Sequence, residues 1–171
     1  MGRGDNHPAV LLDLDFEDPA IIRLTYSPSP EFTLGSQRRA ERVCKVVQEA
    51  LSSHNPQSIK RFENSISAIF ESRYRDSVQE VQETIVGRLN ELQKEKLTPK
   101  MVEEVLGITP QERSRWGKDG RLPRSGSAML RKGQQRIVIY THAPTEIAKI
   151  AADRQLIEQW RSEDRAQKEH G

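Results

Sequence analysis

The side chains best suited to chemistry lie along one predicted helix that follows Thr109. The run Thr109-Pro110-Gln111-Glu112 predicts the start of this helix, because a threonine and a glutamate three residues apart can cap each other's backbone N–H groups. Trp116, with Glu112 and Arg113 one turn earlier, marks the buried side. The outward face is then expected to carry Gln111, Ser114, Arg115 and Lys118.

This outward face has the chemistry that reads base edges in the major groove of DNA. Glutamine can pair bidentately with adenine and arginine with guanine, whereas a merely solvated helix face more often carries glutamate and lysine. The face therefore predicts contact with double-stranded DNA. The alternative is an ordinary helical hairpin with a charged surface.

Positive charge is concentrated around the same helix. The whole chain of 171 residues has 27 Lys and Arg against 25 Asp and Glu, a net charge of only +2. Between residues 113 and 136, however, Asp119 is the single acidic residue. The basic residues of this segment are Arg113, Arg115, Lys118, Arg121, Arg124, Arg131, Lys132 and Arg136. Such a local excess is typical of a nucleic-acid-binding surface.

The segments on either side predict how this helix is positioned. Thr98-Pro99 is a helix start of its own, and Gly107 supplies a turn, so two short capped helices form a helix-turn-helix. Residues 128–131 and 136–140 are predicted strands around a turn at 132–135. The tip of this hairpin carries Arg131, Lys132, Gln134 and Arg136, which suit a minor groove or its flanking phosphates. A solvated hairpin tip is the alternative.

The run from Arg115 to Pro123, RWGKDGRLP, resembles the "rWxxdGrLP" signature of the excisionase and AlpA branch of the MerR-like winged helix-turn-helix superfamily. The resemblance covers residues 98 to about 150. It implies that Trp116 and Leu122 are core residues and that Gly120 makes a left-handed turn. It also implies a β-hairpin wing, a closing helix, and phosphate contacts from Arg121 and Arg124.

The complete set of expected DNA contacts combines the helix, the turn after it and the hairpin tip. It consists of Thr109, Gln111, Arg113, Ser114, Arg115, Lys118, Arg121, Arg124, Arg131, Lys132, Gln134 and Arg136.

The rest of the chain divides by composition. Residues 1–35, acidic and rich in glycine and proline, predict a flexible arm in which 21–26 forms a short strand or docks on a partner. Residues 36–96 predict a helical dimerisation or interaction module. Within it, residues 59–92 are expected to form one long helix, or two joined near 73–77. We expect the apolar stripe of this module to pair with a second copy, the alternative being an intramolecular bundle. Residues 98–143 are the predicted winged helix-turn-helix, and residues 144–171 a C-terminal helix.

The sequence offers no set of residues for catalysis. A single cysteine, Cys44, excludes an internal disulfide, and the four histidines lack the spacing of zinc ligands. The longest apolar runs, 9–12 and 137–140, are far shorter than a membrane span. We therefore expect no enzyme activity, no cofactor, no metal, no membrane contact, and a cytoplasmic, nucleoid-associated location.

These observations together predict a mostly α protein that binds double-stranded DNA sequence-specifically. We expect a transcriptional regulator, acting as a homodimer. One alternative is an architectural accessory factor of mobile DNA, in excision, partition or packaging. Another is a coiled-coil adaptor that binds a protein through its helical module and does not bind DNA.

Overall fold

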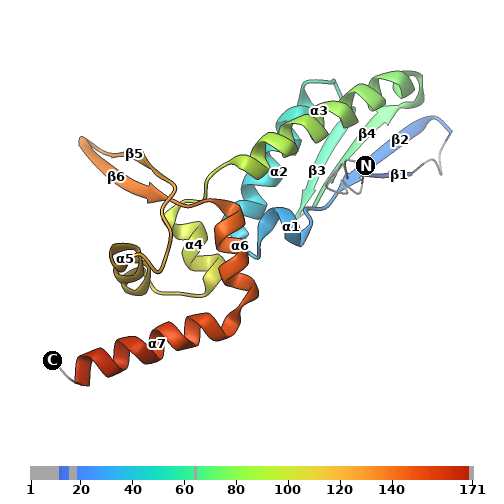
Figure 1. Cartoon of the computed structure of the whole chain (residues 1–171). Coiled ribbons are helices and arrows are strands. Elements are labelled where there is room, and N and C mark those ends of the chain that lie inside the picture. The colour runs from blue at the N-terminus through green and yellow to red at the C-terminus, as the bar shows by residue number, and fades with distance from the viewer. Residues whose placement is uncertain (1–11, 16–18, 64, 170–171) are drawn as a thin grey trace, which may run out of the picture. The chain divides into compact units, whose positions relative to one another are not determined.

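The computed structural model describes residues 12–15, 19–63 and 65–169 and shows a mixed α/β, mostly helical protein (Figure 1). The chain forms two compact units, Met1–Gln93 and Lys94–Gly171. Each unit has its own buried apolar residues. No helix in the described part of the chain is both long and apolar enough to cross a bilayer.

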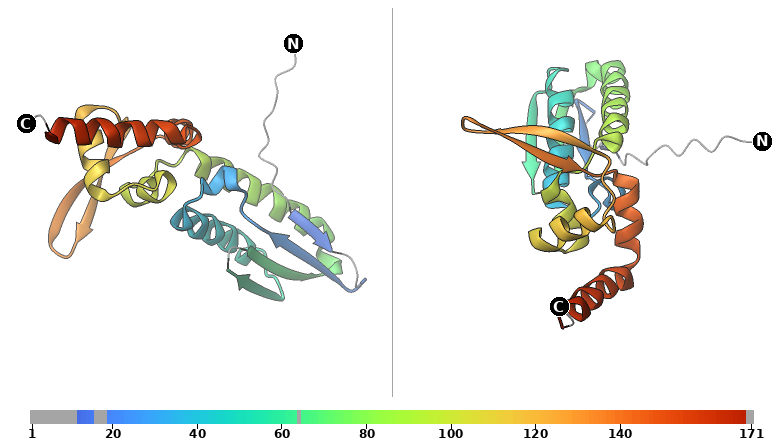
Figure 2. Two further views of the ribbon diagram at one scale, coloured as in Figure 1. Left: turned by 90° about the horizontal axis from the view of Figure 1, so that it is seen from below. Right: turned by 60° about the vertical axis from the view of Figure 1, so that its left-hand side comes forward.

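The first unit is an antiparallel four-stranded sheet packed against helices (Figure 2). The strand order is β1-β2-β4-β3, with β1 at Leu12–Asp15, β2 at Ile21–Tyr26, β3 at Ser58–Phe62 and β4 at Ser65–Glu71. The helical elements are α1 (Pro30–Thr33), α2 (Gln37–Ser52), the 3-10 turn Ser72–Tyr74 and α3 (Arg75–Lys94). Alternate residues of β2 and β4 are buried and join the apolar faces of α2 and α3 in one core.

The prediction of a helix over residues 59–70 was wrong, because this segment forms β3, β4 and the turn between them. Its apolar residues include pairs three and four apart, which suggested a helix. In β4, however, Ile66, Ala68 and Phe70 are buried while the residues between them are partly exposed, a period of two. Glu63, with φ 38°, lies in the turn. The expected joint near 73–77 does coincide with the start of α3 at Arg75.

The prediction that the apolar stripe of α3 pairs with a second copy was also wrong. Its members are at most 5% exposed and pack within their own unit against the sheet and α2. They are Val78, Val81, Ile85, Leu89 and Leu92. Because the sheet already covers this stripe, the segment 36–96 is not a helical module with a free seam. The alternative of a coiled-coil adaptor is therefore disfavoured, because it requires this stripe to be exposed.

The prediction of a flexible arm fails for residues 19–35. The proposed strand at Ile21–Tyr26 is confirmed as β2, paired with both β1 and β4. Phe32 of α1 is 1% exposed, and the buried Arg39 donates its Nε–H to the Phe32 carbonyl at 2.5 Å. This part of the arm therefore belongs to the folded unit. Residues 1–11 and 16–18 of the predicted arm lie outside the described residues.

The second unit contains the two short helices and the hairpin that the sequence predicted. Its elements are α4 (Pro99–Leu106), α5 (Pro110–Asp119), β5 (Gly126–Lys132), β6 (Gln135–Thr141), α6 (Pro144–Ala152) and α7 (Arg154–Glu169). Gly107 and Gly120, at φ 62° and 87°, end α4 and α5 in the left-handed conformation. Trp116 and Leu122 are at most 1% exposed, which confirms them as core residues.

The predicted C-terminal helix is two helices. Asp153, at φ −105° and ψ 83°, interrupts the helix, and its carboxylate accepts the Leu156 N–H at 3.3 Å. Asp153 therefore caps the start of α7 after ending α6. This break allows α7 to run in a different direction from α6, as Figure 1 shows.

A core substitution tests whether the apolar stripe of α3 belongs to the core of its own unit. Leu89→Ala should lower the free energy of unfolding of the first unit by about 2–5 kcal/mol, because it leaves a cavity in a fully buried core. Urea unfolding followed by far-ultraviolet circular dichroism measures this change. Arg88→Ala, at an exposed position of the same helix, is the control and should have little effect. The loss should not depend on protein concentration; a loss that disappears at high concentration would show a dimer seam instead.

Candidate nucleic-acid interface

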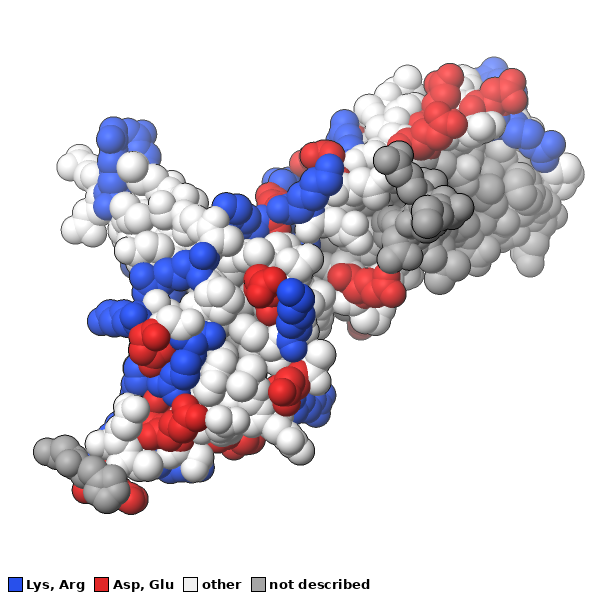
Figure 3. Space-filling model, in the orientation of Figure 1, with Lys and Arg blue, Asp and Glu red and all other residues white. Residues whose placement is uncertain are grey.

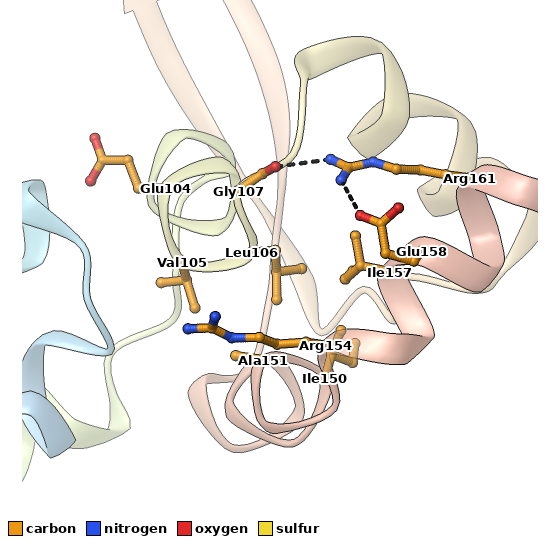
Figure 4. A pocket seen from close by; sticks show the side chains of 10 residues that line it. All are labelled: Glu104, Val105, Leu106, Gly107, Ile150, Ala151, Arg154, Ile157, Glu158 and Arg161. Atoms are coloured by element: carbon orange, nitrogen blue, oxygen red, sulfur yellow. Dashed lines mark hydrogen bonds and ion pairs between the residues drawn. The ribbon is translucent and has the colours of Figure 1, made fainter.

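The start of α5 is held by the predicted capping box. The Thr109 hydroxyl accepts the Glu112 N–H at 3.2 Å, and the Glu112 carboxylate accepts the Thr109 N–H at 2.7 Å. Arg161 of α7 donates to Glu112 at 2.8 Å. It also donates to the carbonyl of Gly107 at 3.0 Å, as Figure 4 shows. One guanidinium thus secures both the end of α4 and the start of α5. The hydrogen bond from Arg161 also helps to hold the pKa of Glu112 below its ordinary value.

The opposite end of α5 is held by Asp164 of α7, whose side chain is 7% exposed. The carboxylate accepts the indole N–H of Trp116 at 3.0 Å, Arg115 Nη1 at 2.5 Å and Arg121 Nη2 at 2.6 Å. Burial works to raise the pKa of Asp164, but the three donors outweigh it and hold the pKa below the ordinary value. The rings of Trp116 and Trp160 pack edge to face with centroids 5.0 Å apart. The signature residues of α5 therefore fix this helix against α7.

Three of the arginines expected to bind DNA are ion-paired inside the unit. Arg113 pairs with Glu103 at 2.9 Å, and its side chain is 24% exposed. Arg121 pairs with Asp119 and Asp164 at 2.6 Å each and is 18% exposed. We therefore assign Arg113 and Arg121 structural roles and leave them out of the proposed interface. Arg115, paired with Asp164 but 41% exposed, still reaches the surface.

Arg124 has no carboxylate partner among the described residues and is held by an aromatic ring instead. Its guanidinium carbon lies 3.9 Å from the centroid of the Tyr140 ring, a cation–π contact. On α5, a Cβ atom at Gly117 would lie 3.2 Å from both Nε and Nη2 of Arg124. The glycine thus allows Arg124 to lie close against α5, between the helix and the ring. This contact presents an ordered cation with free N–H donors beside the outward face of α5.

The outward face of α5 consists of Gln111, Ser114 and Lys118. Gln111 and Lys118 are exposed, and Ser114 is partly exposed. In the described part of the chain none of the three has a side-chain hydrogen bond or ion pair. They are therefore available to an external partner, as expected. The Thr109 hydroxyl, by contrast, already caps α5.

The strands β5 and β6 confirm the predicted hairpin, which carries two cations side by side. Arg131 lies directly opposite Arg136 in the ladder, so both side chains project to the same face. Both are exposed, as are Lys132 and Gln134 near the turn, where Gly133 has φ 63°. Among the described residues, none of these cations has an ion pair. Like charges directly opposite each other destabilise a hairpin unless an anion lies between them. Figure 3 shows the basic side chains at the end of the hairpin.

Sequence reasoning missed two basic residues on α7. Arg165 and Lys168 are exposed and line a groove together with Thr109, Gln111 and Arg115. The signal was the spacing of Arg161, Arg165 and Lys168, four and three residues apart, which places them on one face of a helix. The cationic surface therefore continues from the start of α5 onto α7.

One further cavity and the single cysteine lie outside this surface. A cavity of about 360 Å³ lies between α4, α6 and α7, where Arg154 extends over an apolar wall (Figure 4). Among its other polar side chains, Arg161 and Glu158 pair with each other at 2.8 Å. In the first unit Cys44 is buried, and burial raises the pKa of its thiol, which disfavours the nucleophilic thiolate. The described residues contain no cluster of His, Cys, Asp and Glu that could hold a metal ion.

Comparison of the chain with models of protein families, with curated proteins and with solved structures finds no match. The winged helix-turn-helix resemblance therefore rests on the residues of its signature and on the arrangement of the second unit.

The Asp164 cluster can be tested by its effect on stability. Asp164→Asn should lower the free energy of unfolding of the second unit by about 2–3 kcal/mol at neutral pH, because two arginines lose their buried counter-charge. Tryptophan fluorescence measures this unit selectively, since both tryptophans, Trp116 and Trp160, lie in it. Glu163→Gln, which removes one exposed ion pair with Arg121, is the control and should cost far less.

The pH dependence of the unfolding free energy gives a second test of the role of Asp164. Because the folded-state pKa of Asp164 is lowered, its stabilisation is present above the ordinary value of 3.8 and is lost as the pH falls below it. The difference between wild type and Asp164→Asn should therefore shrink below that pH. A difference that stays constant down to the acid transition would contradict an ionic role for Asp164.

Proposed function

We propose that the second unit is a winged helix-turn-helix that binds double-stranded DNA sequence-specifically, with α5 as the recognition helix and the β5–β6 hairpin as the wing. The observation that carries this proposal is the opposed pair Arg131 and Arg136, which has no carboxylate partner in the described part of the chain. A phosphate supplies the anion that this pair lacks. Lys132 adds a further cation near the turn of the hairpin, and Arg124, stacked on Tyr140, places another beside α5.

In this proposal each group of side chains has a distinct role. Gln111, Ser114 and Lys118 enter the major groove, where Gln111 is the side chain best suited to a bidentate contact with adenine. Arg124 and the wing residues bind the phosphates on one side of the groove. Arg165 and Lys168 of α7 bind phosphates on the other side of α5. Arg115 supports the helix through Asp164 and contacts DNA with its exposed edge.

The biological use that we propose is transcriptional regulation, in the cytoplasm and on the nucleoid. An architectural role in mobile DNA would use the same interface and is the alternative. The adaptor function is disfavoured, because the stripe on which it rested is buried.

Salt dependence and base selectivity test the two kinds of contact separately. Lys132→Ala should weaken binding to all sequences alike and reduce the slope of log affinity against log salt by about one unit, the loss of one phosphate contact. Gln111→Ala should instead weaken binding to the preferred sequence by roughly 1–3 kcal/mol and leave mixed-sequence DNA nearly unaffected. Fluorescence anisotropy with a duplex selected from a random pool, and with a scrambled duplex, measures both. Lys149→Ala, an equal change of charge on α6, is the control. An unchanged salt slope for Lys132→Ala would remove the wing from the interface.

The position of Arg124 gives an independent test that separates binding from folding. Gly117→Ala should displace Arg124, whose flexible end can move, and weaken DNA binding roughly three- to tenfold. The same change should leave stability unchanged or raise it by up to about 1 kcal/mol, because alanine favours a helix more than glycine does. Gly87→Ala in α3, where a Cβ meets nothing within 4 Å, is the matched control and should not alter binding. Unaltered DNA affinity in Gly117→Ala would show that the Arg124 contact does not serve binding.

A further inference from the structure

The break between α6 and α7 leaves a cavity in the second unit. Asp153 ends α6, and α7 continues in a different direction, so that these two helices and the end of α4 border a cavity of about 360 Å³ (Figure 4). This volume lies within the range of small-molecule sites, roughly 300–1,000 Å³, whereas packed protein interiors contain few voids larger than a water molecule. The cavity therefore has room for a ligand of about ten non-hydrogen atoms.

One wall of the cavity is apolar and is built by all three helices. Leu106 of α4, Ile150 of α6 and Ile157 of α7 form it, and Val105 and Ala151 extend it (Figure 4). The first three residues are only 7–9% exposed, so this wall belongs to the core of the unit. A wall of this kind accepts the apolar part of a ligand and shields it from water.

Four charged residues line the cavity, and only one of them offers its charge to a ligand. Glu158 and Arg161 pair with each other at 2.8 Å, and Arg161 also donates to the Gly107 carbonyl. The Glu104 carboxylate is directed away from the wall in Figure 4. Arg154 has no hydrogen bond or ion pair with any described residue, and its side chain extends across the wall. The cavity thus combines an apolar wall with one available guanidinium.

This combination selects a class of ligand by charge and polarity. A guanidinium donates two parallel N–H bonds to the two oxygens of a carboxylate. A phosphate also pairs with arginine, but its remaining oxygens would face the apolar wall without donors, which costs free energy. A neutral apolar molecule would make no use of Arg154. A monocarboxylate with an apolar tail fits both the wall and the cation.

We propose that this cavity binds a small organic carboxylate, with its apolar tail against Leu106, Ile150 and Ile157 and its carboxylate on Arg154. The inference concerns the second unit alone and does not depend on the proposed contact with DNA. The cavity adjoins the turn into α5, because Gly107 lines it and Arg161 holds that turn. A bound ligand stabilises the unit, since only the folded chain offers the site.

Isothermal titration calorimetry on the full chain tests the proposal with two carboxylates of suitable size, octanoate and 3-phenylpropanoate. Binding of either acid supports the proposal, and the stronger of the two shows whether the site prefers an aliphatic or an aromatic tail. Octanamide and 3-phenylpropanamide have the same shape without the charge and should bind about tenfold more weakly or less. Absence of binding by both acids at millimolar concentration, or equal binding by the amides, would overturn the proposal.

Two substitutions locate the ligand in the cavity. Arg154→Gln should weaken binding of the acids roughly ten- to a hundredfold and leave the amides unaffected, because the exposed Arg154 supplies charge and not core packing. Lys149→Gln removes an exposed cation of α6 outside the cavity and is the matched control, with unchanged binding expected. Ala151→Phe fills part of the cavity and should block acids and amides alike.

Thermal unfolding followed by tryptophan fluorescence shows whether each variant is folded, since both tryptophans lie in this unit. Acid binding that is unchanged in Arg154→Gln, or that survives in folded Ala151→Phe, would place the ligand elsewhere on the surface and overturn the proposal. If Ala151→Phe does not fold, the comparison of Arg154→Gln with Lys149→Gln decides the question by itself.

Discussion

The second unit depends on one buried carboxylate. Asp164 of α7 receives the indole N–H of Trp116 and the guanidinium groups of Arg115 and Arg121. A buried charge is tolerated only where donors surround it, and three donors from one short segment meet that condition. The same contacts fix α5 against α7, so the orientation of the outward face of α5 follows from the position of Asp164.

Ion pairing divides the basic segment into two groups that the sequence does not distinguish. Arg113 and Arg121 face carboxylates from α4, α7 and the end of α5, and their charge is used within the unit. The hairpin cations and Lys118 have no such partner among the described residues. Only this second group has charge left to attract phosphate. A count of basic residues therefore overestimates the positive charge available to an external anion. The ion pairs of each residue show which side chains still carry unpaired charge.

The two units bury their apolar surface in different ways, and the difference has consequences for assembly. In the first unit an amphipathic sheet covers the stripe of α3, which leaves no seam for a second copy. In the second unit a small core around Trp116 and Trp160 holds the helices, but the hairpin extends beyond it. Apolar side chains are thus exposed on the β5–β6 hairpin and buried on α3, whose pattern suggested pairing with a second copy.

The sequence by itself determined the local features of this protein. The caps of α4 and α5, the glycine turns and the hairpin were all predictable, because each depends on contacts between residues close in the chain. Tertiary structure decided the rest. Whether Ile66 and Phe70 lie on a strand or a helix depends on their partners in β2, 40 and 48 residues earlier, and periodicity over so short a run fits both. Arg115 and Arg121 likewise pair with Asp164, which lies 49 and 43 residues later, and no local sequence pattern predicts these contacts.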